Sequence, residues 1–200
     1  MVEQLAQEYA GQPVLFLEHD VDDPTLSARQ WRWWNAFGGG SVILPMVMVD
    51  SGNQISNGPE DFDTQYRAMV DASLARDPQA EIVASGQRSG DALHFDVQVT
   101  NRSGVTLGSG NGATVWAIVY EEYAAPGSGR LTNRFVRVVA STSVSPDLAP
   151  DATGAFTLDT PALSGVNWGG LRAIVLVDYR PAGSSGAYDM LQAASVSVTQ

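Results

Sequence analysis

The sequence contains no cysteine, no lysine and only two histidines, His19 and His94. Without cysteine the chain cannot form disulfides, thiolate nucleophiles or cysteine-type zinc sites. Two distant histidines are too few for another kind of zinc site. No apolar run approaches the roughly 18 residues that a membrane span needs. We therefore expect no bound cofactor and no membrane span.

Positive charge is also scarce, because 11 arginines face 22 acidic residues and the formal net charge is −11. Nucleic acid and anionic membrane surfaces repel a chain of this charge, so we expect neither as a partner. A protein or peptide partner stays open. The 200 residues are enough for one large domain or two small ones.

The pattern of the chain changes near Pro78, which predicts two domains over residues 1–78 and 79–200. In the first part, apolar residues at helical spacing predict three helices, which cover residues 2–9, 28–37 and 59–74. Continuous apolar runs and the turn that follows them predict three strands, which cover residues 14–17, 42–49 and 54–56. The expected order of elements is α-β-α-β-β-α.

This order and the motif L-P-M-V-M-V-D-S-G-N-Q at residues 44–54 resemble a thioredoxin-like domain that lacks its first strand. In that family a cis proline opens this strand, and Pro45 holds its position. The resemblance implies that the backbone of Leu44 offers hydrogen bonds to an extended substrate. The family's C-x-x-C motif would lie upstream of Met1, so no residue of this chain inherits the catalytic role.

The second part has alternating apolar residues separated by clusters of Gly, Ser, Pro and Asn, which predicts short strands. The expected strands cover residues 81–85, 92–101, 113–122, 133–142, 153–158, 171–179 and 188–198. Seven such strands suggest an antiparallel sandwich of immunoglobulin or fibronectin type III character. The expected fold class is therefore α+β and multidomain: a truncated thioredoxin-like α/β domain followed by an all-β immunoglobulin-like sandwich.

Two segments of the second part, V-Q-V-T-N-R-S-G at 97–104 and L-A-P-D-A-T-G-A-F-T-L at 148–158, resemble loops of bacterial immunoglobulin-like surface modules. The segment from Ala173 to Ala194 resembles the end of outer-membrane proteins of the Omp28 type, which join a thioredoxin-like part to a β-sandwich. Both resemblances imply an extracytoplasmic location, in the cell envelope or secreted.

Candidate site residues fall into three groups. Leu44 and Pro45 form the loop assigned by resemblance. Trp31 and Trp34 crowd the predicted helix at 28–37 together with a third tryptophan, and they either stack on a ligand or pack against the second domain. The acidic cluster Glu18, Asp20, Asp22 and Asp23 has oxygens that suit a hard cation, but it lacks the spacing of an EF-hand loop and is better interpreted as a solvated loop.

The leading hypothesis is a non-catalytic binding or scaffolding protein of the cell envelope with a redox-inactive thioredoxin-like domain. The alternative is a fragment of a thiol-disulfide oxidoreductase whose C-x-x-C lies upstream of Met1. A third hypothesis is a homodimer that covers the open sheet left by the missing strand, because an unpaired edge exposes backbone hydrogen-bonding groups.

Overall fold

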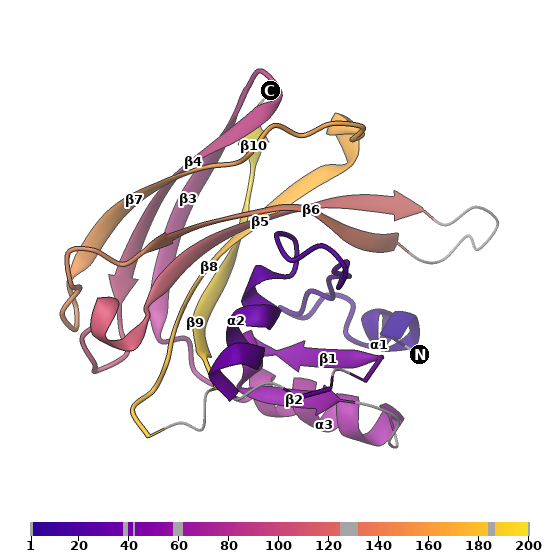
Figure 1. The fold of residues 1–200 in the computed structure, drawn as a ribbon, viewed down its shortest axis with the longest axis horizontal. Coiled ribbons are helices and arrows are strands. Elements are labelled where there is room, and N and C mark those ends of the chain that lie inside the picture. Colours follow the sequence, from indigo (N-terminus) through magenta and orange to yellow (C-terminus); the bar gives the residue numbers. More distant parts are fainter. Residues whose placement is uncertain are drawn as a thin grey trace.

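The structure is a computed structural model that describes residues 2–37, 40–41, 43–57, 62–124, 132–183 and 187–199. Across these residues the chain forms three α-helices and ten strands (Figure 1). The helices are α1 (Val2–Glu8), α2 (Ala28–Phe37) and α3 (Phe62–Leu74). None of the described helices is long and apolar enough to cross a membrane.

Eight of the strands form two sheets of four. The first sheet has the order β10-β3-β4-β7, with bounds Val198–Thr199, Ala80–Ser89, Ala92–Asn101 and Thr153–Asp159. The second has the order β6-β5-β8-β9, with bounds Thr132–Ser143, Thr114–Ala124, Leu171–Tyr179 and Asp189–Val196. All pairings are antiparallel except that of β10 with β3.

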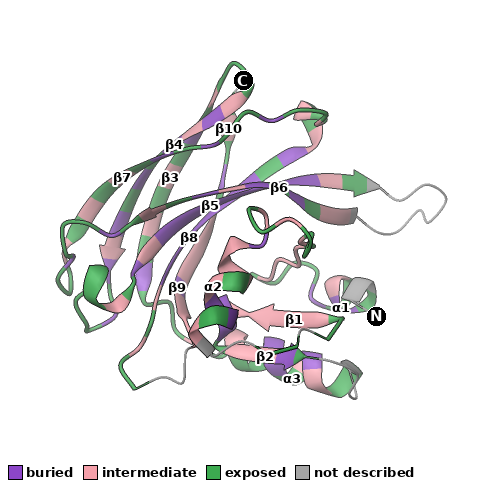
Figure 2. Cartoon of the chain, viewed as in Figure 1, coloured by how far each residue is buried: buried purple, intermediate pink, exposed green. Residues whose placement is uncertain are grey.

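The two sheets pack face to face because one side of each strand is apolar. In β4, residues 93, 95, 97 and 99 are buried, and they meet the inward residues of β5 and β8 in one core cluster. Buried residues accordingly concentrate along β4, β5 and β8 (Figure 2). The strands predicted for the second part are confirmed, with β4 and β8 at the predicted bounds. The last predicted strand is divided, since β9 pairs with β8 whereas Val198 and Thr199 pair with β3.

The first part of the chain forms a small layer against the outer face of the second sheet. It contains one hairpin, β1 (Met46–Val49) and β2 (Gln54–Asn57), joined by the 3-10 turn η1 (Asp50–Gly52). Helices α1 and α3 share an apolar cluster in which Leu5, Tyr9 and Tyr66 are buried. Figure 1 shows the hairpin and these helices beside the sandwich.

The apolar run at 14–17 lies between these two layers. Val14 and Phe16 pack on the cluster of α1 and α3. Leu15 and Leu17 pack on the outer face of the second sheet. The run is therefore partly buried on both of its sides, although the structure assigns no strand there.

The expected fold class, a truncated thioredoxin-like α/β domain followed by an all-β immunoglobulin-like sandwich, is wrong. The described chain is predominantly β, with helices of only 7, 10 and 13 residues. Among the described residues of the first part the expected central sheet does not form: residues 14–17 make no ladder with β1, and β1 pairs with β2 alone. The one bridge beside this run joins Glu18 to Phe135 of β6. Apolar burial on both sides holds the run in place without a ladder.

Candidate functional site

The loop assigned by resemblance lies on the surface just before β1. The Leu44–Pro45 peptide bond is cis, as predicted. Leu44 is 60% exposed, and Ile43 beside it is also exposed. The side chain of Asn57 in β2 fixes the loop, because its Oδ1 accepts from the Ile43 backbone N–H at 2.8 Å and its Nδ2 donates to the Ser41 carbonyl at 3.3 Å.

The tryptophans of α2 are divided between interior and surface. Trp33 and Trp34 are buried, with ring centroids 5.6 Å apart and an interplanar angle of 45°. Trp31 is 36% exposed. Of the two tryptophans predicted to bind, Trp31 therefore offers an accessible ring, whereas Trp34 belongs to the packing of the first part.

The acidic cluster stabilises the turn that leads into α2. Glu18, Asp20 and Asp22 are exposed. An Asp20 carboxylate oxygen accepts from the Asp22 backbone N–H at 2.9 Å. Asp23 accepts from the backbone N–H and the hydroxyl of Thr25 at 2.8 and 2.6 Å, and these hydrogen bonds lower the pKa of Asp23. Within the part of the chain that the structure describes, no three acidic or histidine side chains are arranged to hold a metal ion.

His19 is a packing residue in the same turn. Its Nδ1 lies 2.8 Å from the carbonyl oxygen of Leu26, so Nδ1 carries the hydrogen and donates it. Burial and, to a smaller extent, the nearby Arg29 guanidinium lower the pKa of His19 to about 4, against the opposite effect of the Leu26 hydrogen bond. The imidazole is therefore neutral at pH 7, because burial disfavours its charged form.

A polar cluster centred on Asp178 of β8 joins α2 to the sandwich. The Asp178 side chain is fully buried, and one of its oxygens accepts from the indole Nε1 of Trp116 at 3.0 Å. Arg32 of α2 forms an ion pair with the other oxygen, and Arg29 lies 3.9 Å from it. Burial lowers the pKa of Arg29, an effect that the Asp178 carboxylate opposes.

The Arg32 guanidinium also lies over two aromatic rings, 4.8 Å from the ring centre of Trp116 and 3.6 Å from that of Tyr188. A cation over an aromatic face is attracted by its negative potential. One arginine of α2 thus meets a buried carboxylate and two rings of the sandwich, and it fixes the position of the helix.

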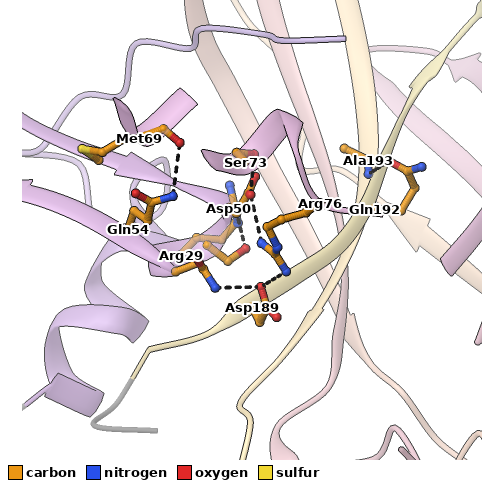
Figure 3. Close-up of polar contacts among 11 residues, drawn as sticks. Arg29, Asp50, Gln54, Met69, Ser73, Arg76, Asp189, Gln192 and Ala193 are labelled. Carbon is orange, nitrogen blue, oxygen red and sulfur yellow. Dashed lines mark hydrogen bonds and ion pairs between the residues drawn. The ribbon is translucent and has the colours of Figure 1, made fainter. Parts of the chain in front are cut away.

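A second polar cluster joins the end of α3 to β9. Figure 3 shows Arg76 between Asp50 of the hairpin turn and Asp189 of β9. Its two terminal nitrogens lie 3.0 Å from Asp50 and 2.6 Å from Asp189. Ser73 donates to Asp50 at 2.5 Å, and Asn53 donates to Asp189 at 3.2 Å. Both carboxylates are nearly buried, so the cluster is less screened by water than a surface ion pair.

The turn that carries Asp50 has an unusual backbone. Asp50, Ser51 and Gly52 have φ values of 49°, 61° and 96°. A Cβ on Gly52 would lie 2.2 Å from Cδ1 of Trp33, so the buried indole excludes any side chain at this position. Ser51 accepts a hydrogen bond from Arg29 at 2.6 Å. The turn thus holds α2, α3 and β9 together.

Sequence reasoning missed both polar clusters. The signal for the first was a single acid, Asp178, at the end of an otherwise apolar buried strand, together with Arg29 and Arg32 one helical turn apart. A buried carboxylate requires a partner, and two arginines on one helix face supply it. No comparable signal indicated which acids Arg76 would meet.

Comparisons with known proteins assign no family. No protein-family model matches the chain, and no curated protein matches it. Among solved structures, it is similar to the sporulation control protein Spo0M from Bacillus subtilis, with 10% identity, a TM-score of 0.37 and coverage of 61% of this chain and 50% of that one.

It is also similar to the GH20 exo-β-N-acetylglucosaminidase of Vibrio harveyi, with 17% identity, a TM-score of 0.29 and coverage of 60% and 18%. A β-glucosidase from Listeria innocua gives 14% identity, a TM-score of 0.27 and coverage of 60% and 16%. The chain spans half or less of each of these proteins, and likenesses at these scores carry no functional argument. The thioredoxin-like and envelope-protein resemblances of the sequence stay predictions.

Proposed function

We propose that this chain is a non-catalytic binding protein whose loop at residues 43–45 receives an extended segment of a protein partner. The observation that carries the proposal is the state of Leu44, whose apolar side chain is 60% exposed on a loop clamped by Asn57. Among the described residues, the backbone N–H and carbonyl of Leu44 form no hydrogen bond. They are free to pair with an extended peptide.

The chemistry of such a contact is that of strand addition. Main-chain hydrogen bonds supply affinity, and side chains at alternate positions supply specificity. Leu44 offers both kinds of contact at one point, and the two hydrogen bonds of the Asn57 side chain hold the loop in place. Pre-organisation of this kind lowers the entropy that binding costs.

A non-catalytic role agrees with the ionisable groups of the chain. There is no cysteine, so thiol-disulfide exchange has no nucleophile here. His19 is bonded to a backbone carbonyl, and His94 pairs with Asp159 at 2.7 Å on an exposed sheet face. A location in the cell envelope is part of the proposal and rests on the sequence resemblances alone.

The test is a selection of random peptides on the purified chain, followed by fluorescence polarisation with the selected peptides. Leu44→Asp is the test variant. Val83→Asp is the matched control, since Val83 is an equally exposed apolar residue on β3, outside this loop. We expect Leu44→Asp to weaken binding by about tenfold or more, which corresponds to about 1.4 kcal/mol, and Val83→Asp to leave it unchanged. Equal binding by all three proteins, or a selection without binders, contradicts the proposal.

A second candidate is a homodimer, because the described part of β1 has one unpaired edge. A second copy that adds a strand at this edge would satisfy its backbone groups. Sedimentation velocity over a wide concentration range tests this candidate. A monomer at every concentration counts against it without affecting the peptide proposal.

A further inference from the structure

A cleft of about 480 Å³ opens at one end of the sandwich, where β8 runs into its connection to β9. Its walls include Val105, Asn111, Tyr179, Arg180, Pro181 and Tyr188. None of the described residues that line it is acidic, although the chain has 22 acidic residues. The volume lies in the range of small-molecule sites.

Arg180 differs from the other arginines that the structure describes. Nine of those ten arginines form an ion pair with a carboxylate. Arg180, the tenth, has neither an ion pair nor a side-chain hydrogen bond with any described residue. Its backbone N–H donates to the carbonyl of Asn111 at 2.8 Å, which fixes the main chain beneath the exposed guanidinium. In a chain of charge −11, a cation without a carboxylate is the exception.

Two tyrosines, Tyr179 and Tyr188, also line the cleft. Within the described residues, the hydroxyls of Tyr179 and Tyr188 make no hydrogen bond. The ring of Tyr188 is held by Arg32, which is itself paired with the buried Asp178. The neighbouring carboxylate of Asp189 is paired with Arg76 at 2.6 Å, so its charge is largely balanced.

The remaining polar side chain of the cleft is already satisfied. Asn111 accepts from the Gly108 backbone N–H at 3.0 Å and donates to the Thr106 carbonyl at 2.8 Å. Its amide oxygen and its amide nitrogen each already have a backbone partner. The one charged side chain of the described lining is therefore Arg180, beside the apolar surface of Val105 and Pro181.

We propose that this cleft binds a small carboxylate with an apolar body. The guanidinium of Arg180 has the planar fork that matches a carboxylate in two parallel hydrogen bonds. The apolar wall covers the body of the ligand. The absence of acidic lining residues removes the repulsion that such a ligand meets elsewhere on this surface.

The test is isothermal titration calorimetry with three probes: benzoate, its uncharged analogue benzamide, and inorganic phosphate. Arg180→Gln is the test variant. Arg172→Gln is the matched control, since Arg172 is an equally charged, half-exposed residue near the other end of β8 and pairs with Glu122. We expect benzoate to bind the native chain and the control alike. Arg180→Gln should weaken benzoate binding by about tenfold or more, because hydrogen bonds to charged groups are strong.

Each other outcome overturns the proposal. If benzamide binds as tightly as benzoate, the negative charge of the ligand does not contribute to binding. Phosphate binding without benzoate assigns the cleft to another oxyanion, and binding that survives in Arg180→Gln places the ligand elsewhere. No heat with benzoate at millimolar concentration excludes a carboxylate site of measurable affinity. The loop at residues 43–45 is absent from the cleft lining, so these results are independent of the peptide proposal.

Discussion

The two parts of the chain are stabilised by different interactions. In residues 80–199, eight strands pair over long registers, ten residue pairs between β3 and β4 among them, and enclose a continuous apolar core. Among the residues of 2–76 that the structure describes, the only ladder is the four residue pairs of β1 and β2. The first part instead depends on its apolar cluster and on side chains that reach the sandwich.

Because of this difference, the stability of the first part depends on the contacts at its border with the sandwich. Arg32 meets Asp178, and Arg76 meets Asp189, so both polar clusters use a carboxylate from the sandwich. A backbone ladder tolerates the loss of one side chain, because no single side chain contributes much to the register of the paired strands. A buried ion pair does not, because the remaining charge stays buried without a partner. Substitutions at the border should therefore loosen the first part before they affect the sandwich.

The largest effect is expected for Asp178→Ala. The change leaves Arg32, Arg29 and the indole N–H of Trp116 without their buried acceptor. Removing one partner of a buried pair costs about 3 to 5 kcal/mol of unfolding free energy. Urea unfolding measures the loss, and hydrogen exchange should show faster exchange in α2 than in β4.

Asp178→Asn is the matched control for that change, since its amide oxygen still accepts from Trp116 but carries no charge. We expect a smaller loss than for alanine. If exchange accelerates equally in α2 and β4, the two parts unfold as one unit and the comparison between them fails.

The next largest effect is expected for Gly52→Ala. The new Cβ would lie 2.2 Å from Trp33, and the residue would keep a φ of 96°. Overpacking and backbone strain together cost roughly 2 to 4 kcal/mol. The control is Gly90→Ala, at a φ of 63° with no atom within 4 Å of the new Cβ. It should lose clearly less in the same urea measurement, and equal losses would show that Trp33 does not limit the site.

The sequence predicted the sandwich strands well and the first part poorly, for a physical reason. Alternation such as that of residues 92–101 identifies both the strand and its inward face, because the side-chain period is two. The run at 14–17 has no alternation, since both its sides are partly buried. A continuous apolar run does not reveal whether a ladder partner exists, and here the expected ladder with β1 is missing.

The candidate site could likewise be predicted only in part from the sequence. The cis bond at Pro45 was predicted correctly, because a local sequence motif defined that position. Trp34 was predicted to bind but is buried. Helical spacing shows which residues share a face of the helix, but not which face packs against the rest of the protein. The pairing of Arg32 with Asp178 joins residues 146 positions apart, and only the assembled fold brings them together.

A pH effect of intermediate size is expected at His19. Its pKa in the folded chain is about 4, below the ordinary value of 6.5, so folding favours the neutral imidazole. The contribution to stability is complete above pH 6.5 and is lost as the pH falls towards 4. Between pH 7 and pH 5 the loss amounts to about 2 kcal/mol. The measurement is urea unfolding at a series of pH values.

His19→Gln isolates this contribution from the many carboxylates that also titrate. Its stability should fall less than that of the native chain over the same pH range. His94→Gln serves as a second control, because hydrogen bonding to Asp159 raises the pKa of His94 and gives the opposite sign. Parallel curves for the native chain and His19→Gln would contradict the assignment.

The smallest expected effect on stability concerns two ion pairs, one at the border with the sandwich and one on the surface. Arg67 pairs with Glu8 at 2.8 Å, but both side chains are more than 40% exposed, so water and salt screen the pair. Arg76 is less exposed and bridges two nearly buried carboxylates. We expect Arg76→Gln to lower the free energy of unfolding by about 1 to 3 kcal/mol. Arg67→Gln should shift the urea midpoint by no more than the error of the measurement. Equal shifts would mean that the border pair contributes no more than a surface contact, and that apolar packing alone holds the first part against the sandwich.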